Sequence, residues 1–142
     1  MIVCTAVDDA NGMLFNKRRQ SQDKILREHL LGLCGEKPLF VTPYTAKQFS
    51  EEEQSRLRIE ENPLEAASDG DFCFIETFSL LPYAAKIETL ILYKWNRKYP
   101  ADFFFDLSLL APAWTLKETE EFAGFSHDMI TKEVYIHETI ET

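Results

Sequence analysis

Asp23 is the leading candidate for a catalytic role, because of its residue type and its position in the sequence. A carboxylate that lines an apolar cleft can hydrogen-bond a heterocyclic ring or supply a proton to a substrate. The same residue also fits a structural role, because an acidic side chain in the first turn of a helix complements the helix dipole, here behind the expected cap Ser21. The residues alone leave both roles open, and Asp23 is the candidate catalytic residue.

A second candidate site is the basic run Lys17-Arg18-Arg19. Three cations close to the helix start expected at Ser21 would bind a small phosphate or carboxylate rather than a dinucleotide. A loop with three solvated charges is the alternative. Thr45, at the expected start of another helix, is placed either to contact phosphate or only to cap that helix.

Patterns for other kinds of catalysis are not found in the sequence. The three histidines fall on an expected helix face, in a polar loop and in a strand, and no pair of them has the spacing of metal ligands. No serine lies in a nucleophile-elbow motif, and no cysteine stands next to a base. We therefore expect no metal.

The composition restricts the compartment and the partners. The 142 residues carry a net charge of −9, which disfavours binding to nucleic acid and to anionic membranes. Contact with RNA through Lys17–Arg19 and Arg97-Lys98 is a weaker hypothesis that this charge opposes. Cys4, Cys34 and Cys73 form no CxxC pair, so we expect buried thiols and a cytoplasmic protein.

Hydrophobic periodicity and turn residues predict alternating strands and helices in one domain, residues 1–142. We expect four buried strands and then an antiparallel pair: Ile2–Val7, Pro38–Val41, Phe72–Ile75, Thr89–Trp95, Trp114–Glu121 and Lys132–His137. The expected helices are Gln22–Cys34, Thr45–Ile59 with a bend near Ser50, and Ser79–Lys86, with a loop over Glu60–Gly70. This order predicts a three-layer αβα domain with a mostly parallel sheet and an antiparallel C-terminal edge.

The order and spacing of several segments match a known family over nearly the whole chain, apart from a gap in the middle. The matching segments are Ile2–Gly12, Asp23, Lys37–Val41 with Thr45, Phe72–Ile75, Leu80–Leu92, Asp102–Phe105, Trp114–Leu116, Glu118–Phe122 and Val134-Tyr135. Together they resemble the dihydrofolate reductase superfamily, which includes the reductase domain of riboflavin biosynthesis. The resemblance implies that fold, NADPH as cofactor and, from the riboflavin branch, a homodimer.

Three departures from the family pattern fall on the cofactor site. Where the family has a Gly-Gly pair that lets the backbone approach the pyrophosphate, this sequence has Glu76-Thr77, which adds negative charge and bulk. Thr42-Pro43 replaces the expected glycine and basic residue before Thr45. The segment Glu60–Gly70 is too short for the strands and helix that cradle the adenosine half of the cofactor.

The sequence therefore favours a divergent dihydrofolate-reductase-like domain that has lost NADPH-dependent pterin reduction. It would act as a module that binds a small anionic ligand or associates with itself, with no cofactor. The alternative is an NADPH-dependent reductase of a pterin- or pyrimidine-like substrate. There Asp23 would orient the substrate, Thr45 would contact phosphate, and Lys17-Arg18-Arg19 would replace the lost cation.

Overall fold

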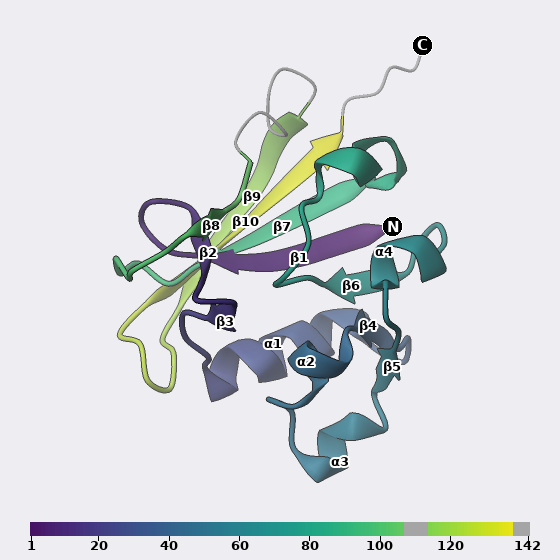
Figure 1. The fold of residues 1–142 in the computed structure, drawn as a ribbon, viewed down its shortest axis with the longest axis horizontal. Helices are drawn as coiled ribbons and strands as arrows, with labels where there is room; N and C mark the ends of the chain where they lie inside the picture. The colour runs from purple at the N-terminus through teal and green to yellow at the C-terminus, as the bar shows by residue number, and fades with distance from the viewer. Residues whose placement is uncertain (107–113, 138–142) are drawn as a thin grey trace.

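The computed structural model describes residues 1–106 and 114–137, and its main element is a seven-stranded sheet (Figure 1). The strand order is β5-β4-β6-β1-β7-β10-β9. The strands are β1 (Ile2–Val7), β4 (Leu39–Val41), β5 (Leu57–Ile59), β6 (Phe72–Phe74), β7 (Thr89–Lys94), β9 (Trp114–Phe122) and β10 (Ile130–His137).

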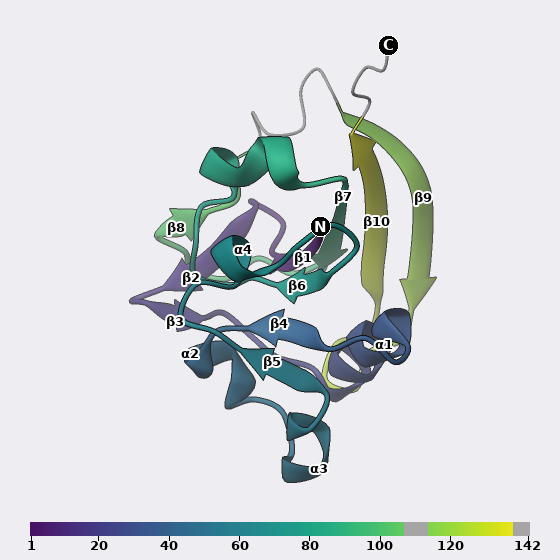
Figure 2. The same ribbon diagram turned by 90° about the vertical axis from the view of Figure 1, so that its right-hand side faces the viewer.

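Strands β5, β4, β6, β1 and β7 run parallel, and β10 and β9 add an antiparallel edge. In register, Val3 on β1 lies between Cys73 on β6 and Leu90 on β7. Figure 2 shows β9 as the outer strand beside β10. The predicted fold class is confirmed, including the antiparallel C-terminal pair.

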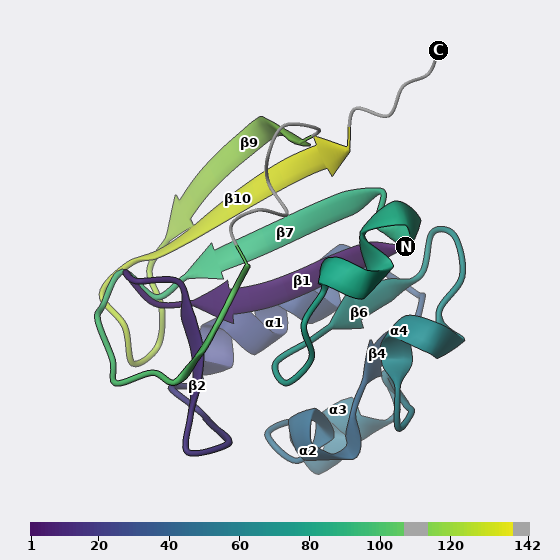
Figure 3. The same ribbon diagram turned by 45° about the horizontal axis from the view of Figure 1, so that its top comes forward.

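Alternating side chains along the parallel strands build a core on each face of the sheet. On β1, Cys4 packs with Leu26 and Leu30 of α1 (Lys24–Cys34). Val3, on the other face, belongs to the core that contains Leu64 of α4 (Pro63–Ala66). The 3₁₀ helix η1 (Leu81–Lys86) lies across the sheet from α1 (Figure 3). Side chains alternate between the two faces along a strand, and both faces of these central strands are therefore buried.

A second, three-stranded sheet was not predicted. It pairs β2 (Gly12–Phe15) with β3 (Arg18–Arg19) and with β8 (Phe103–Phe104). The hairpin between β2 and β3 turns at Asn16 and Lys17, whose φ angles are 52° and 63°. The basic run is thus part of a hairpin instead of a loop, and the turn places Lys17 in the left-handed region.

The middle of the chain differs most from its prediction. The expected helix Thr45–Ile59 is replaced by α2 (Pro43–Ala46), α3 (Glu51–Gln54) and strand β5. A capping box at Ser50 and Glu53 starts α3, as its sequence indicated. The helix α4 lies inside the segment expected to be a loop, Glu60–Gly70.

All three cysteines are buried with free thiols, in agreement with the sequence. Burial raises the pKa of Cys34 to about 11 and that of Cys73 to about 12, because a thiolate is poorly solvated among apolar side chains. Burial also raises the pKa of Cys4 well above its ordinary value. In the described part of the chain, no helix is both long and apolar enough to span a membrane.

Candidate ligand site at the carboxyl edge of the sheet

The parallel strands β1, β6 and β7 point toward the small sheet, on the left of Figure 1. Asp8 directly follows β1, Thr42 follows β4, and Glu76 lies two residues beyond β6. All three residues are buried. Ligands of open α/β sheets bind outside this edge, so its polar groups are the first candidates for a site.

Glu76 is the centre of a hydrogen-bonded group that we call the ion-pair cluster: Arg19, Tyr44, Thr45, Gln48 and Glu76. The Arg19 guanidinium donates to both carboxylate oxygens of Glu76, over 3.0 and 3.2 Å. Thr45 Oγ1 donates to Glu76 Oε1 over 2.8 Å, and Gln48 Nε2 donates to the same oxygen over 3.3 Å. Arg19 also lies 4.3 Å above the Tyr44 ring and donates to the Tyr44 carbonyl. The Glu76 charge is therefore neutralised from within the protein.

Two of the residues predicted to bind an anion, Arg19 and Thr45, form hydrogen bonds within the ion-pair cluster instead. The Arg19 guanidinium donates to Glu76 and to the Tyr44 carbonyl, and the Thr45 hydroxyl donates to Glu76. Thr45 is also not the cap of α2, because Thr42 Oγ1 accepts from the Thr45 amide and is the N-cap. An anion at this place would have to compete with a carboxylate that is already bound.

Beside the ion-pair cluster lies a cavity of about 480 Å³, here called the β2–β3 cavity. Its lining combines aromatic, cationic and amide side chains: Phe15, Asn16, Arg18, Arg19, Gln20, Tyr99 and Pro100. Lys17 is exposed at the hairpin turn and is not part of the lining. Of the predicted basic run, the structure thus brings Arg18 and Arg19 to the cavity.

Asp8 fixes two walls of the β2–β3 cavity. Its Oδ2 accepts from the Gln20 side-chain amide and from the Tyr99 backbone amide, each over 3.0 Å. Its Oδ1 accepts from the backbone amides of Ala10 and Gly12. Although burial opposes ionisation, these hydrogen bonds lower the pKa of Asp8 below its ordinary value, so the carboxylate stays charged and keeps the walls in place.

Asp23 is the N-cap of α1, and it also joins the helix to the β9–β10 loop. Asp23 Oδ1 accepts from the amides of Ile25 and Leu26, whereas both oxygens accept from the Phe125 amide. The predicted cap Ser21 is therefore wrong, and helix α1 begins at Lys24 instead of Gln22. With 2% of its surface exposed, Asp23 does not line the cavity.

His127 connects Asp23 to two hydroxyl groups. Its Nδ1 lies 2.9 Å from Asp23 Oδ2, and its Nε2 lies 3.1 Å from Ser21 Oγ and 3.0 Å from the Tyr99 hydroxyl. The imidazole stacks on Trp95, with ring centres 4.5 Å apart. We call Ser21, Asp23, Tyr99, Ser126 and His127 the Asp23 network, since Ser126 donates to Asp23 through its amide and its hydroxyl.

The hydrogen bonds of this network determine its protonation. Burial alone would raise the pKa of Asp23, but donation from Phe125, His127 and Ser126 holds that pKa well below its usual range. An ionised carboxylate only accepts, so His127 Nδ1 carries the hydrogen that it donates to Asp23, and in this tautomer Nε2 carries the lone pair. The Nε2 lone pair faces the hydroxyls of Ser21 and Tyr99.

Sequence reasoning missed His127 because it lies 104 positions from Asp23 in a polar loop. A local signal exists in Gly124, where an added Cβ would lie 2.8 Å from both Asp23 Oδ2 and the His127 carbonyl oxygen. Only a residue without a side chain allows the loop to approach Asp23 this closely.

We expect Gly124→Ala to lower the free energy of unfolding by about 1–3 kcal/mol, because the loop must move away from Asp23. Urea denaturation measures this change. Gly32→Ala is the matched control: it adds the same methyl group on α1, where no atom lies within 4 Å, and should stabilise the protein by about 0.5–1 kcal/mol. Equal effects of the two variants would contradict the close approach at Gly124.

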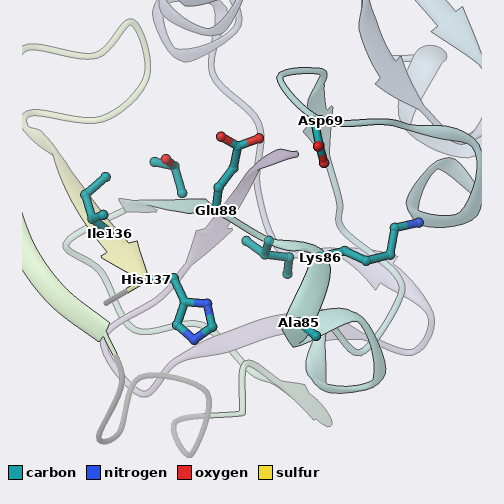
Figure 4. Close-up of a pocket in the computed structure, with 8 residues that line it drawn as sticks. Asp69, Ala85, Lys86, Glu88, Ile136 and His137 are labelled. Carbon is teal, nitrogen blue, oxygen red and sulfur yellow. The ribbon is translucent and has the colours of Figure 1, made fainter. Parts of the chain in front are cut away.

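A second cavity, of about 580 Å³, opens at the opposite edge of the sheet, where β7 begins and β10 ends (Figure 4). Two of its charged side chains are already engaged: Glu88 accepts from the N-terminal ammonium of Met1 and from the Gly70 amide, and Lys86 donates to the Leu64 carbonyl. His137 stacks on Trp114 at 4.6 Å. Among the described residues that line this cavity, no hydrogen bonds join a hydroxyl, an imidazole and a carboxylate in series, as they do in the Asp23 network. Within residues 1–106 and 114–137, no group of three His, Cys, Asp or Glu side chains is placed to bind a metal.

Comparison with known proteins identifies the fold. No family model matches the chain, and no curated protein matches its sequence. Among solved structures, the chain is similar to dihydrofolate reductase from Enterococcus faecalis complexed with NADP(H) and RAB-propyl. The match has a TM-score of 0.64 and 11% sequence identity, and covers 98% of this chain and 97% of that one. The chain therefore has a dihydrofolate-reductase-like fold, as the resemblance implied.

Proposed function

We propose that this dihydrofolate-reductase-like domain has lost conventional NADPH-dependent pterin reduction and binds a small anionic molecule in the β2–β3 cavity. The observation that carries this proposal is the ion-pair cluster. Arg19 and Glu76 occupy the carboxyl edge of the sheet, where a dinucleotide pyrophosphate would need glycine and a cation. A cofactor phosphate would have to displace a bidentate ion pair that Thr45 and Gln48 also support.

We attribute exclusion of the dinucleotide to the space that the Arg19–Glu76 ion pair occupies, more than to charge repulsion between Glu76 and a phosphate. The sequence alone suggested that Glu76 would repel a phosphate by its charge. Arg19 neutralises that charge, with 3.0 Å between Arg19 Nε and Glu76 Oε2. Only the short helix α4 stands between β5 and β6, which favours loss of the adenosine pocket.

The β2–β3 cavity has the chemistry for a small aromatic or planar anion. Phe15 and Tyr99 supply ring surfaces, and Arg18 supplies a cation that is exposed beside the paired Arg19. About 480 Å³ lies within the range of small-molecule sites and is suited to a compact ligand. A carboxylate or phosphate on a ring would pair with Arg18 while the ring packs on the aromatic walls.

A thermal-shift titration tests the proposal with benzoate and phenyl phosphate as anions, benzamide as the neutral analogue, and NADPH. A ligand at 100 times its Kd contributes about 2.7 kcal/mol, which for a chain of this size raises the Tm by about 8 °C. We expect such a rise with an anion, a smaller one with benzamide, and none with NADPH at about 1 mM.

The matched pair Arg18→Gln and Arg58→Gln separates site binding from general charge effects. Arg18 lines the cavity, whereas Arg58 lies exposed on β5 and pairs with Glu60. Only Arg18→Gln should remove the shift with the anion. A rise with NADPH that saturates would contradict the loss of the cofactor site and favour the reductase alternative.

The remaining partner assignments extend the same proposal. Buried, unpaired thiols agree with a reducing cytoplasm, and the net charge of −9 opposes nucleic acid and anionic membranes. Of the predicted cations that RNA would need, Arg19 is bound to Glu76. The homodimer implied by the riboflavin branch stays a prediction.

A further inference from the structure

Ser21, His127 and Asp23 are joined by two hydrogen bonds in series. Asp23 Oδ2 lies 2.9 Å from His127 Nδ1, and His127 Nε2 lies 3.1 Å from Ser21 Oγ. A hydroxyl, an imidazole and a carboxylate in this order are the arrangement by which unrelated enzyme folds activate a serine, and it is recognised by geometry and not by sequence order. Both distances are within the reach that a nucleophile and its base require.

The state of each group suits its place in the series. The Asp23 carboxylate is ionised and fixes the His127 ring by accepting from Nδ1, which leaves the Nε2 lone pair facing the hydroxyls of Ser21 and Tyr99. Stacking on Trp95 restricts rotation of the same ring. A base that is oriented in this way can remove the hydroxyl proton without first reorganising.

The hydroxyl end of the series is accessible, and the other end is not. His127 and Asp23 are 3% and 2% exposed, whereas Ser21 is half-buried. Ser21 directly follows Gln20, which lines the β2–β3 cavity. Tyr99 also lines the cavity, and its hydroxyl lies 3.5 Å from Ser21 Oγ. The nucleophile thus stands beside a space that can contain a substrate.

We infer that Ser21 is the nucleophile of an acyl-transfer site and that the protein hydrolyses small esters that carry an anionic group. The anionic substrate class rests on the proposed function, because Arg18 in the β2–β3 cavity supplies the cation. The nucleophile rests on the Asp23 network alone. The two parts therefore succeed or fail separately.

The reaction balances with water as its only co-reactant. Ser21 Oγ attacks the ester carbonyl carbon while its proton moves to His127 Nε2, and the Tyr99 hydroxyl donates to the oxyanion. The carbonyl re-forms as the C–O bond to the alcohol breaks, and the alcohol leaves with the proton from Nε2. Water, deprotonated by His127, then attacks acyl-Ser21, which releases the acid and restores the Ser21 hydroxyl.

A fluorophosphonate probe tests the nucleophile without requiring an anionic ligand. We expect one covalent adduct on the full chain by intact mass, located at Ser21 by peptide mapping. Ser21→Ala should remove the adduct while the fold persists, since Asp23 and not Ser21 caps α1. Ser55→Ala, a change of an exposed serine outside the network, should be labelled like the unchanged protein. His127→Gln should slow labelling by about 10²–10⁴-fold.

Ester hydrolysis then tests the substrate class. The mono-p-nitrophenyl ester of succinate should be hydrolysed with a lower KM than p-nitrophenyl acetate. Arg18→Gln should raise the KM for the succinate ester and leave the KM for the acetate ester unchanged. Asp23 acts through His127 as a positioning residue, so Asp23→Asn, measured where the variant is folded, should lower kcat and leave KM unchanged.

Each failure has its own signature. No adduct on the folded protein, or an adduct that persists in Ser21→Ala, overturns the nucleophile even if benzoate still raises the Tm. An adduct at Ser21 with equal KM values for the two esters and no effect of Arg18→Gln overturns the anionic substrate class, whereas the absence of a thermal shift with benzoate and phenyl phosphate overturns the ligand assigned to the cavity.

Discussion

Asp23→Ala is expected to lower the free energy of unfolding by about 3–4 kcal/mol, the largest effect of any single change considered. The substitution removes the N-cap of α1 and the acceptor for the Phe125 and Ser126 amides of the β9–β10 loop. It also leaves His127 Nδ1 buried without Asp23. Urea denaturation at neutral pH measures the loss. Asp128→Ala, an exposed change in the same loop, should stay within about 0.5 kcal/mol.

The pH dependence of the same site has a defined sign. Because the folded pKa of Asp23 lies below its unfolded value of about 3.9, its contribution is complete above that value and is lost as the pH falls below it. The unchanged protein should therefore lose stability between about pH 4 and pH 2 more steeply than Asp23→Asn, which carries no acid at this position. Equal slopes in this range would contradict the ionised, multiply bonded carboxylate.

Glu76→Ala is expected to cost about 3 kcal/mol, since it leaves the Arg19 guanidinium largely buried without its carboxylate. Arg19→Ala should cost a similar amount. The double variant Arg19→Met/Glu76→Leu should be less destabilised than either single variant, because no uncompensated charge remains. Urea denaturation measures all three variants, and the cycle that adds the double variant Arg19→Ala/Glu76→Ala to the two alanine variants gives the coupling energy.

The exposed ion pair between Arg58 and Glu60 is the matched control for this cycle. Arg58 Nε lies 2.7 Å from Glu60 Oε2, which is closer than the 3.0 Å between Arg19 Nε and Glu76 Oε2. However, the Arg58 side chain is 58% exposed, whereas that of Arg19 is 16% exposed. Glu60→Ala should therefore change stability by less than about 1 kcal/mol. Additive effects at Arg19 and Glu76, with no coupling, would refute the ion-pair cluster as an energetic unit and remove the main support for a blocked cofactor site.

Strands made of long runs of buried apolar residues could be predicted from the sequence, whereas elements whose position depends on the conformation of a turn could not. Strands such as β1 and β7 are rich in β-branched and aliphatic residues, and such apolar runs are typical of strands that are buried on both faces. The β2–β3 hairpin escaped prediction because its turn, Asn16-Lys17, contains no glycine although both residues adopt positive φ. β5 falls in a segment that the sequence predicts as helix, because a strand of three residues carries no periodicity of its own.

At the site, residue types were identified but their partners were not. The sequence indicates Asp23 as a candidate catalytic residue and Arg18 and Arg19 as candidate anion-binding residues. The structure places the two arginines at the β2–β3 cavity and Asp23 at the N-cap of α1. The competing caps Ser21 and Asp23 are both good by type, and the choice between them depends on the β9–β10 loop, which donates to Asp23. The partners of Asp23 and Arg19 lie far along the chain, at His127 and Glu76, so local sequence carries no information about them.

The buried thiols have a consequence for following the dynamics of this molecule. Cys4 and Cys73 lie on central strands, whereas Cys34 ends α1 at the periphery of the fold. Because neither shielded sulfur nor protonated thiol is reactive, an alkylating reagent modifies each position only during excursions that uncover it. Modification of Cys34 thus reports fraying of one helix, and modification of Cys4 or Cys73 reports rupture of the whole sheet, so the native cysteines can time both events without added labels.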